Sequence, residues 1–415
     1  MTTLLTDVEA VAASLEPVYQ DLHAHPELSF AEHRTAGIVA ERLRALGYDV
    51  ITGIGGTGVV GVLKNGAGRT VLLRADMDAL PVREATGLSY ASTAHAIDLD
   101  GHDVPVMHAC GHDVHVTCLL GAAEILLRQA VDWSGTLVVL FQPAEEQGGG
   151  ARAMVDDGLY ERIPVPDVVL GQHVAPVPAG VLGVHAGEAF AGADSLLVRL
   201  FGRGGHGSRP ETTIDPVVMA AAAVMRLQTV VSRDVAGSDT AVVTVGQIHS
   251  GTKNNIIPDE ATLGLSIRST TTVVRDRIIA SVHRIVTAEA AASGAEREPE
   301  FIAQESFPVL VNDPAATART VGAFREAFGD QRVLDPGAVT GSEDVGELST
   351  AVGAPLVYWI LGGHDPEQFA AATAAGTVER DIPSNHSPYF APVMRPTLDT
   401  GIAALTVAAR EWFKP

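Results

Sequence analysis

Cysteine, basic residues and aromatic side chains are all scarce in this sequence of 415 residues. The two cysteines, Cys110 and Cys118, cannot form a disulfide framework in a chain of this length. Lysine and arginine number 28 against 50 aspartates and glutamates, which gives a formal net charge of −22. Nucleic acids and anionic membranes are bound through clustered basic residues. Because the sequence contains no such cluster, we expect neither as a partner.

Long hydrophobic runs are also absent from the sequence. No stretch approaches the ~20 uninterrupted apolar residues that a membrane-spanning helix requires. The N-terminal segment places Asp7 and Glu9 where a signal peptide would carry basic residues. The G-x-S-x-G motif of many serine hydrolases is missing, which disfavours that class. Hydrophobic residues nevertheless make up 46% of the chain, so we expect a folded cytoplasmic protein of two or three domains.

The first part of the chain has the pattern of an α/β domain. Near-continuous Val and Leu strands alternate with amphipathic segments, which is typical of a sheet covered by helices on both faces. The pair Asn65-Gly66 lies between two apolar runs and predicts a hairpin turn that joins them. The predicted helices cover residues 5–24, 31–46, 113–130 and 149–157, and the predicted strands cover 59–64, 70–76 and 135–142.

The pattern changes after about residue 186. Strands over 195–201, 240–249 and 260–268 and helices over 214–233 and 272–292 predict a compact α+β domain with helices on one face of its sheet. The α/β pattern resumes at about residue 301, with helices over 315–328 and 397–412 and a strand over 355–361. We therefore predict a discontinuous α/β domain over 1–186 and 301–415, interrupted by an inserted α+β domain over 187–300.

Metal-binding side chains are densest in the segment MHACGHDVH, residues 107–115. Cys110 and His112 are two residues apart, so both side chains point the same way if the backbone there is extended. A thiolate and an imidazole could together hold a first-row transition metal. In the alternative interpretation, Cys110 is a small buried thiol and the histidines are polar loop residues. Cys118, which lies among helical apolar residues, is expected in the core.

Two adjacent carboxylates, Glu145 and Glu146, follow the apolar strand 135–142. Ligands and catalytic groups of open α/β sheets gather beyond the carboxyl ends of the strands. Adjacent carboxylates at such a place can divide the work, because one can bind a metal while the other accepts a proton from water. The alternative is a solvated acidic turn.

Further candidates are His173, Asp76 and Asp78, which follow other apolar strands, and His386 in the segment PSNHSPYF. Each alone would most often be structural. Together with the cysteine and the glutamates they supply enough donors for two metal ions that share a bridging ligand. In the inserted domain, His206 lies in a glycine-rich turn whose spacing fits no common nucleotide-binding motif. Arg268 projects from the face of its strand opposite Leu263, Leu265 and Ile267, where it either solubilises the surface or grips a substrate carboxylate.

The combined motifs resemble a known family over nearly the whole chain. The sequence is similar to the dinuclear metallopeptidase and aminoacylase family that includes carboxypeptidase G. Within that family it most resembles the N-acyl-amino-acid amidohydrolases, such as hippurate hydrolases and indole-acetyl-amino-acid hydrolases. The segments that carry the resemblance, in family order, are DLHAHPELSFAEHRTA, RADMDALPV, MHACGHDVH, FQPAEE, GQHV, GGHGSRP, NNIIPDEA and NHSPYF.

The resemblance implies a zinc-peptidase-like catalytic domain with an inserted lid, and a role for each matching residue. Two divalent ions per subunit are implied, with zinc or manganese first and cobalt or nickel also possible. Glu145 would be the general base, and Asp78 would orient a neighbouring ligand. His206 would polarise the scissile carbonyl, often in the site of the partner subunit. The implied metal ligands are Cys110 as the bridge, His112, Glu146, His173 and His386, and the implied contacts to the substrate carboxylate are Asn255 and Arg268.

The expected reaction is hydrolysis of an N-acyl-L-amino acid that carries an acetyl, benzoyl, indole-acetyl or longer acyl group, by a homodimer formed through the lid. A dipeptidase or carboxypeptidase, or a biosynthetic N-acetyl-amino-acid deacetylase, are alternatives on the same scaffold. A non-catalytic metal-binding protein is disfavoured because Glu145 is present. The segment 91–106 is longer than in plant members. We expect its His95 and His102 to be loop residues, and the segment is a candidate for selecting the acyl group.

Overall fold

The computed structural model describes residues 2–414, with side chains described from Asp7 onward. Residues 1 and 415, the outer ends of the predicted α/β domain, lie outside the described residues. The chain divides into two compact units. The first unit comprises Met1–Gly187, Val311–Gly337 and Asp344–Pro415, and the second comprises Glu188–Leu310 and Ala338–Glu343.

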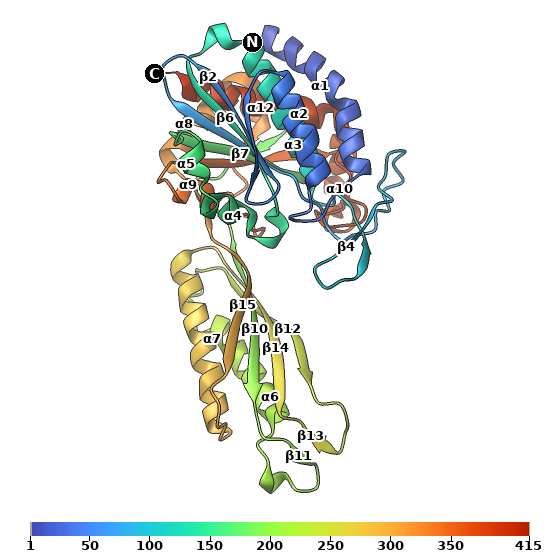
Figure 1. Cartoon of the computed structure of the whole chain (residues 1–415), viewed down its shortest axis with the longest axis vertical. Helices are drawn as coiled ribbons and strands as arrows, with labels where there is room; N and C mark the ends of the chain where they lie inside the picture. Colours follow the sequence, from blue (N-terminus) through green and yellow to red (C-terminus); the bar gives the residue numbers. More distant parts are fainter. Residues whose placement is uncertain (1, 415) are drawn as a thin grey trace. The chain divides into compact units, whose positions relative to one another are not determined.

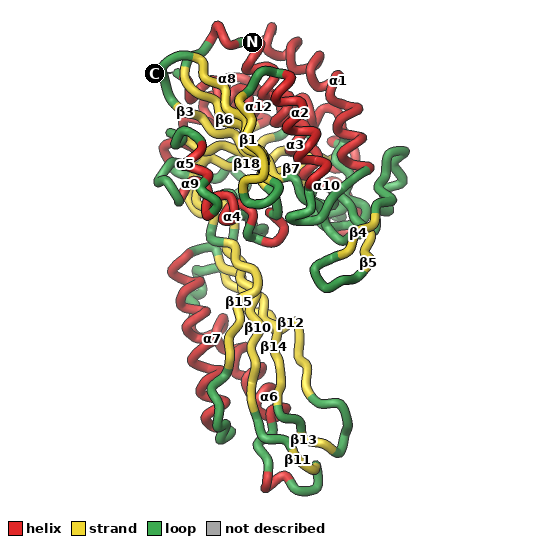
Figure 2. The backbone as a smooth tube through the Cα atoms, in the orientation of Figure 1, coloured by secondary structure: helices red, strands yellow, loops and turns green. Residues whose placement is uncertain are grey.

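The first unit is built on a mixed eight-stranded sheet with the order β1-β2-β6-β3-β7-β18-β8-β17 (Figures 1 and 2). The strands β3, β6, β7 and β18 run parallel at its centre. The bounds are β1 (Asp49–Ile54), β2 (Gly58–Asn65), β3 (Thr70–Asp76), β6 (Gly135–Gln142), β7 (Val168–Pro178), β8 (Leu182–Gly183), β17 (Val333–Leu334) and β18 (Leu356–His364). The central strands are buried on both faces, as their apolar sequences predict.

Helices cover both faces of this sheet (Figure 1). On one face lie α2 (His33–Ala45), α3 (His112–Arg128), α8 (Pro314–Phe328) and α12 (Met394–Phe413), with α1 (Thr2–Ala24) packed on α3 and α12. On the other face, α4 (Gly150–Asp156) contacts β6 and α9 (Gly346–Thr350) contacts β7. The remaining elements of this unit include α5 (Leu159–Arg162), α10 (Pro366–Ala375), α11 (Val378–Asp381), and the hairpin of β4 (His95–Ile97) and β5 (Asp103–Pro105).

The predicted hairpin at Asn65-Gly66 is wrong. β6 lies between β2 and β3, and it pairs antiparallel with β2 and parallel with β3. Because the strand GTLVVLFQ is almost wholly buried, its backbone groups on both edges must be paired, and this requires a neighbour on each side. The hairpin is instead formed by β1 and β2, and β1 was not predicted.

The second unit is an antiparallel sheet with the order β12-β14-β10-β15 and two helices on one face (Figure 1). The alternation predicted for β14 is confirmed, since Leu263, Leu265 and Ile267 are buried while Arg268 is exposed. The bounds are β10 (Gly192–Phe201), β12 (Ala241–Ser250), β14 (Glu260–Ser269), β15 (Glu300–Phe307), α6 (Pro216–Thr229) and α7 (Thr272–Ala292), with the short strands β11 (Gly205–His206) and β13 (Ile256–Ile257). Two further short strands, β9 (Gly187–Phe190) and β16 (Leu310–Asn312), lie where the chain passes from one unit to the other.

The second unit continues beyond the predicted boundary at residue 300. Its fourth strand, β15, pairs with β10 through partners such as Leu197 and Ile302. Residues 301–310 therefore belong to the second unit and not to the α/β domain. The strand was missed because most of its side chains are exposed, so its sequence lacks the apolar alternation of a half-buried strand.

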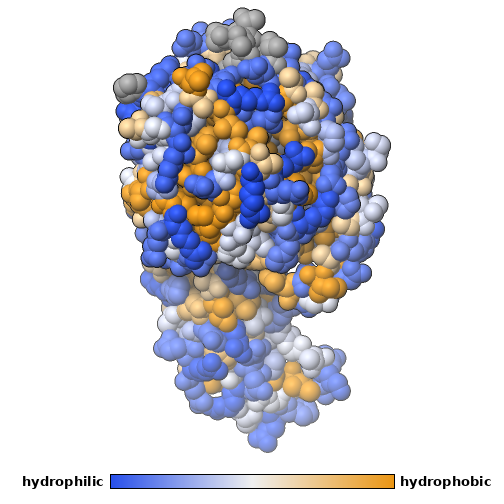
Figure 3. All heavy atoms as spheres, turned by 45° about the horizontal axis from the view of Figure 1, so that its top comes forward, coloured by the Kyte–Doolittle hydropathy of each residue, from blue (hydrophilic) through white to orange (hydrophobic). Residues whose placement is uncertain are grey.

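The surface of the described chain mixes polar and apolar side chains. Figure 3 shows apolar side chains interrupted by hydrophilic ones on the visible face of the larger unit. Such mixing is ordinary for globular proteins, because much of any folded surface is apolar. Among residues 2–414, no helix combines the length and apolar character needed to cross a bilayer.

Candidate metal centre

The candidate residues of the first unit gather near the carboxyl ends of its parallel strands. Asp76 ends β3, and Gln142, at the end of β6, is its register partner. His173 lies in β7, and the turn that follows β6 carries Glu145 and Glu146. A loop before α12 brings in His386, whose backbone N–H donates to the Ala109 carbonyl over 2.8 Å. Segments far apart in the sequence thus converge at one edge of the sheet.

Cys110 and His112 converge through a sharp turn and not through the extended backbone assumed from the sequence. Gly111 between them is left-handed, with φ of 80°, and it precedes the first residue of α3. A Cβ at this position would lie 2.4 Å from Val174 Cγ1, so a larger residue would clash there. Glycine is therefore required both by the backbone conformation and by the close approach of β7.

Two groups of potential ligands share the Cys110 thiol. Cys110, His112 and His173 form one group, and Cys110, Glu146 and His386 form the other, with ligand atoms within 4.8 Å of one another in each. Cys110 Sγ lies 3.5 Å from His173 Nε2, and Glu146 Oε2 lies 3.4 Å from His386 Nε2. All five residues of the predicted ligand set are thereby brought together.

The hydrogen bonds of the two inner histidines leave one ring nitrogen of each facing this cluster. His173 Nδ1 donates to the Val174 carbonyl over 2.8 Å, because a carbonyl can only accept. His112 Nδ1 lies 3.1 Å from Asp78 Oδ1, and a carboxylate likewise accepts the ring proton. When both rings are neutral, the Nε2 atoms of His112 and His173 therefore carry lone pairs, which is the form that binds a metal.

Negative charge is concentrated around these nitrogens and the thiol. Burial and the neighbouring carboxylates Glu146, Glu145 and Asp76 raise the pKa of the Cys110 thiol well above its usual value. Burial raises the pKa of Glu146 to about 8, although the nearby His112 acts in the opposite direction. Burial would lower the pKa of His112, but Asp76, Asp78 and Glu146 outweigh it and raise that pKa to about 10. A bound cation would relieve this crowding of negative groups.

The cluster also contains polar atoms that have no hydrogen-bond partner among the described residues. His112 Nε2 and Glu146 Oε1 are buried and make no hydrogen bond to a described residue, and they lie 3.8 Å apart. Unpaired polar atoms in a protein interior cost free energy, so such atoms call for a ligand or an ion. A soft thiolate, imidazoles and a carboxylate form a donor set that suits first-row divalent metals. The residues present therefore fit a metal centre.

Several supporting residues were not assigned from the sequence. His115 accepts from the Val174 N–H at Nε2 and therefore donates from Nδ1 to Asp76. The Asn385 amide donates to the Val174 carbonyl over 3.1 Å and lies 3.7 Å from Cys110 Sγ. Asp78, which the sequence analysis did single out, accepts at Oδ2 from the Glu146 N–H over 3.0 Å. The three-residue spacing of His112 and His115 on one helix face could have indicated that His115 points the same way.

The predicted residues of the inserted domain lie in the second unit. His206 Nδ1 accepts from the Ser208 N–H over 3.1 Å, which leaves the proton on Nε2. Asn255 is close to His206, because its carbonyl accepts from Gly207 and the next residue, Ile256, is the register partner of His206. Arg268 lies toward the other end of β14 and donates to the Thr340 carbonyl and to Ser342 Oγ, each over 3.1 Å.

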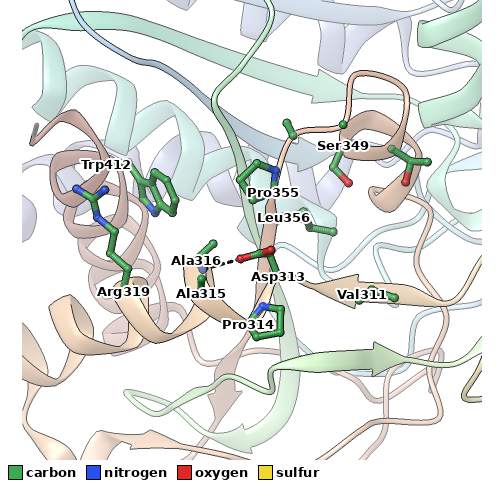
Figure 4. Close-up of a pocket in the computed structure, with 13 residues that line it drawn as sticks. Val311, Asp313, Pro314, Ala315, Ala316, Arg319, Ser349, Pro355, Leu356 and Trp412 are labelled. Carbon is green, nitrogen blue, oxygen red and sulfur yellow. Dashed lines mark hydrogen bonds between the residues drawn. The ribbon is translucent and has the colours of Figure 1, made fainter.

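Two other features of the first unit are separate from the cluster. His95 and His102 lie on the β4–β5 hairpin, where each pairs with an aspartate of the same hairpin. A pocket of about 640 Å³ lies at the start of β18, lined by residues that include Asp313, Arg319, Pro355 and Trp412 (Figure 4). None of the five predicted metal ligands lines it, and Asp313 is already engaged as the N-cap of α8.

Several known hydrolases are similar to this chain over most of its length. Hippurate hydrolase from Campylobacter jejuni is 38% identical over 83% of this chain and 87% of its own length. Thermostable carboxypeptidase 2 from Saccharolobus solfataricus is 36% identical over 86% of this chain and 88% of its own. N-acetyl-L-cysteine deacetylase from Bacillus subtilis is 34% identical over 84% and 80%, respectively.

A solved structure is similar along nearly the whole chain. The YXEP protein of Bacillus subtilis, described as a dinuclear metal-binding peptidase from the M20 family, has a TM-score of 0.75 and 26% identity. The similarity covers 97% of this chain and 99% of that one. The family model for peptidase family M20/M25/M40 matches residues 72–385. The chain therefore belongs to peptidase family M20/M25/M40 and is a metal-dependent amidohydrolase or peptidase.

Proposed function

We propose that this protein hydrolyses the amide bond of N-acyl-L-amino acids at a centre of two divalent metal ions. The two ligand groups that share the Cys110 thiol carry the proposal, because a shared thiolate can bridge two ions. Cys110, His112 and His173 would hold one ion, and Cys110, Glu146 and His386 the other. When bound, the ions would supply Lewis-acid polarisation of the substrate carbonyl and lower the pKa of water. A thiolate and imidazoles suit zinc, and we propose zinc or manganese as the native metal, with cobalt or nickel as alternatives.

Glu145 is the proposed general base. Its carboxylate is 4% exposed and lies 4.0 Å from His112 Nε2, next to the ligand set but outside the two groups that share the thiol. From there Glu145 could take a proton from the attacking water and return it to the departing amine. Asp78 would hold His112 through its Nδ1 and the turn through the Glu146 N–H. Asp78 is thus a positioning residue, which fixes the ligand orientation.

His206 is the proposed donor to the scissile carbonyl oxygen. Because its Nδ1 accepts from Ser208, its Nε2 bears a proton while the ring is neutral. A donor aimed at a developing oxyanion lowers the barrier by a few kcal/mol, on the order of 3. His206→Ala should therefore depress kcat strongly.

Within one chain, His206 and Arg268 lie near opposite ends of the strand β14. His206 lies in β11, and the residues just before β11 are hydrogen-bonded to Asp259, since the N–H groups of Gly202 and Gly204 donate to it. Asp259 directly precedes β14. At about 3.3 Å per residue, the path along β14 from Glu260 to Arg268 spans roughly 26 Å. A small acyl-amino acid could not touch both residues of one chain. We propose that Arg268 holds the substrate carboxylate in one subunit, while His206 and Asn255 come from the partner subunit.

The second unit offers a surface for such a homodimer. Val218 and Met225 on the outer face of α6 are 63% and 73% exposed. β12 forms an edge of the sheet and exposes Val242 and Ile248. An edge strand with exposed apolar residues readily pairs with another chain. We propose that two copies associate through α6 and β12. Val218→Glu combined with Met225→Glu should then give a monomer in light-scattering measurements, whereas an unchanged mass would contradict this interface.

Complementation tests the shared site. His206→Ala and Arg268→Ala should each be nearly inactive, and mixing the two after dissociation should restore activity. Each mixed dimer would hold one site with both residues intact and one site with neither. If mixed dimers are verified by mass spectrometry and no activity returns, the shared site is contradicted. Either both residues then act in the site of their own chain, or at least one of them takes no part in catalysis.

A substrate panel tests the reaction itself. Acetyl-, benzoyl-, indole-acetyl- and long-acyl-amino acids should be compared with dipeptides, with the metal content measured by elemental analysis. The similarity to a carboxypeptidase at 36% identity favours a second candidate, removal of a C-terminal residue from a peptide. The similarity to a deacetylase favours the smallest acyl group. A higher kcat/KM on dipeptides than on every acyl-amino acid would select the carboxypeptidase or dipeptidase. We also propose a cytoplasmic location, supported by the free thiols Cys110 and Cys118.

A further inference from the structure

Glu32 is a buried carboxylate for which the proposed reaction has no use. It is 0% exposed, and it has no ion-pair partner among residues 7–414. It stands immediately before α2, yet its side chain makes no capping hydrogen bond to that helix. Buried carboxylates are costly unless their oxygens are hydrogen-bonded. The contacts of Glu32 therefore indicate what it does.

Those contacts lead to the turn that carries Glu145 and Glu146. Glu32 Oε1 accepts from the Ala144 N–H over 2.8 Å and from the Phe30 N–H over 2.9 Å. Glu32 Oε2 accepts from the Thr57 hydroxyl. A residue from the N-terminal segment thus binds the backbone directly before the proposed base.

Ala144 adopts a backbone conformation that alanine avoids. Its φ of 49° and ψ of 42° are left-handed, and it immediately precedes the short 3₁₀ turn Glu145–Gln147. Such a conformation costs a non-glycine residue free energy and persists only where the surroundings enforce it. The Ala144 carbonyl accepts from Gly150, and the Ala144 N–H donates to Glu32. Glu32 is therefore one of the groups whose hydrogen bonds hold the Ala144 backbone in place.

We propose that Glu32 is a positioning residue that fixes the left-handed Ala144 and so aims the Glu145 and Glu146 side chains. The inference rests on the proposed function only in taking Glu145 as the base and Glu146 as a ligand. In this proposal Glu32 acts by accepting the hydrogen bond of the Ala144 N–H with a side chain of the required length. The negative charge of Glu32 is not needed. Ser29 of the same segment supports the neighbouring strand end in a similar way, because its hydroxyl donates to Asp78 Oδ2 over 2.6 Å.

Three substitutions of Glu32 separate reach from charge. Glu32→Gln keeps the acceptor oxygen for Ala144 and Phe30, and Thr57 can reverse its hydroxyl to accept from the new amide. Glu32→Asp keeps the charge but shortens the reach by one methylene, and Glu32→Ala removes the acceptor. We expect Glu32→Ala and Glu32→Asp to lose about 10- to 100-fold in kcat and in zinc affinity, with KM little changed. Glu32→Gln should stay close to the unaltered chain in both measurements.

A second substitution tests the backbone directly. Glycine adopts left-handed conformations without the cost that alanine has. Ala144→Gly introduced into Glu32→Ala should therefore recover part of the lost kcat and zinc affinity. A merely structural role of Glu32 would not predict this recovery.

Glu27→Ala is the matched control. Glu27 lies in the same segment and accepts from the Arg34 and Thr35 N–H groups at the start of α2, with no contact to Ala144. Its loss should leave kcat and zinc affinity unchanged. Unchanged kcat and zinc affinity in Glu32→Ala, or equal losses in Glu32→Gln and Glu32→Ala, would overturn the proposal. Should Glu32→Ala fail to fold, the contrast between Gln and Asp decides. Glu145→Ala, assayed in parallel, tests the proposed base separately, because zinc affinity is measured without substrate.

Discussion

Glu145 and Glu146 are neighbours in the chain but have different surroundings. Glu146 contacts His386 and His112, and its N–H donates to Asp78. Glu145 is the more remote from His112 Nε2, at 4.0 Å against 3.8 Å. These distances differ little. The proposal that Glu146 is the metal ligand and Glu145 the base therefore depends on the group of Cys110, Glu146 and His386, which does not include Glu145.

Substitution of each glutamate should therefore have a different result. Glu145→Ala should retain both metal ions and the fold but lose about 10²- to 10⁴-fold in kcat, the usual contribution of a general base. Glu146→Ala should lose metal as well as activity. Elemental analysis of the purified variants measures their metal content, and circular dichroism shows whether they are folded. Metal loss in Glu145→Ala, with metal retained in Glu146→Ala, would mean that the two roles are exchanged.

His23 is buried between two carboxylates that are not among the five candidate metal ligands. Its Nδ1 lies 2.7 Å from Asp113 Oδ2 and its Nε2 lies 3.1 Å from Glu84 Oε1. Burial would lower the pKa of His23, but the hydrogen bonds to Asp113 and Glu84 outweigh it and raise that pKa to about 10. The imidazolium therefore stabilises the fold fully below its unfolded pKa of about 6.5. This stabilisation is lost as the pH rises toward 10.

His23→Leu should be destabilised most at low pH. Removing one partner of a buried ion pair typically costs on the order of 3–5 kcal/mol. The difference in thermal midpoint between His23→Leu and the unaltered chain should be largest near pH 6 and should shrink toward pH 10. His25→Ala serves as the control, because the His25 side chain is exposed and its bond to Asp21 is a surface contact. A difference that stays constant over this pH range would show that His23 is neutral in the fold.

At the scale of elements, the sequence predicted those helices and strands whose apolar pattern is set by burial. β6 and α7 have the predicted bounds, because a buried apolar strand and a long amphipathic helix can be recognised from the local sequence pattern alone. The position of β6 between β2 and β3 was not predictable, since strand order depends on contacts distant in sequence. β1 and β15 were missed because exposed strands lack apolar alternation.

The candidate site was predictable in its ligand types but not in its backbone. The ligand residues could be recognised by their chemistry and order. The left-handed conformations of Gly111, Ala144 and His386 could not, because two of the three are residues that rarely adopt them. Asn385, whose amide joins the Cys110 carbonyl to the Val174 carbonyl of β7, also has no pattern of its own in the sequence.

The turn before α3 gives a prediction at this scale. Gly111→Ala combines the left-handed penalty, about 1–2 kcal/mol, with the clash against Val174. The clash should displace Cys110 relative to His112 and lower zinc affinity by about 10-fold or more, measured by titration against a chelator. Gly87→Ala is the matched control, because Gly87 has a similar φ of 77° but open space at its Cβ position. Equal zinc affinity in the two variants would contradict the proposed role of this turn.

At the scale of the whole molecule, the two units have separate hydrophobic cores. The ligand cluster lies entirely in the first unit, where its negative groups are crowded. Metal binding should therefore stabilise the first unit and leave the core of the second unaffected, because a ligand stabilises only the structure that binds it.

Removal of the metal by a chelator should change the rate of amide hydrogen exchange in the first unit but not in the second. Removal of the metal should accelerate exchange around residues 107–115 and 142–148, while exchange in α7 and β14 stays unchanged. Mass spectrometry of peptides from the chelated and reloaded protein measures both regions in one sample. Equal acceleration in α7 would contradict the independence of the two cores.

The length of β14 has a consequence for how the protein would be assayed. If the proposed shared site is right, His206 beyond one end of that strand and Arg268 near the other serve different sites, and a solitary chain would hold only part of the proposed catalytic set. Turnover per mole would then depend on dilution, falling as chains separate and recovering as they re-associate. Progress curves started from concentrated and from dilute stocks would begin at different rates and converge, a hysteresis that a self-sufficient monomer lacks.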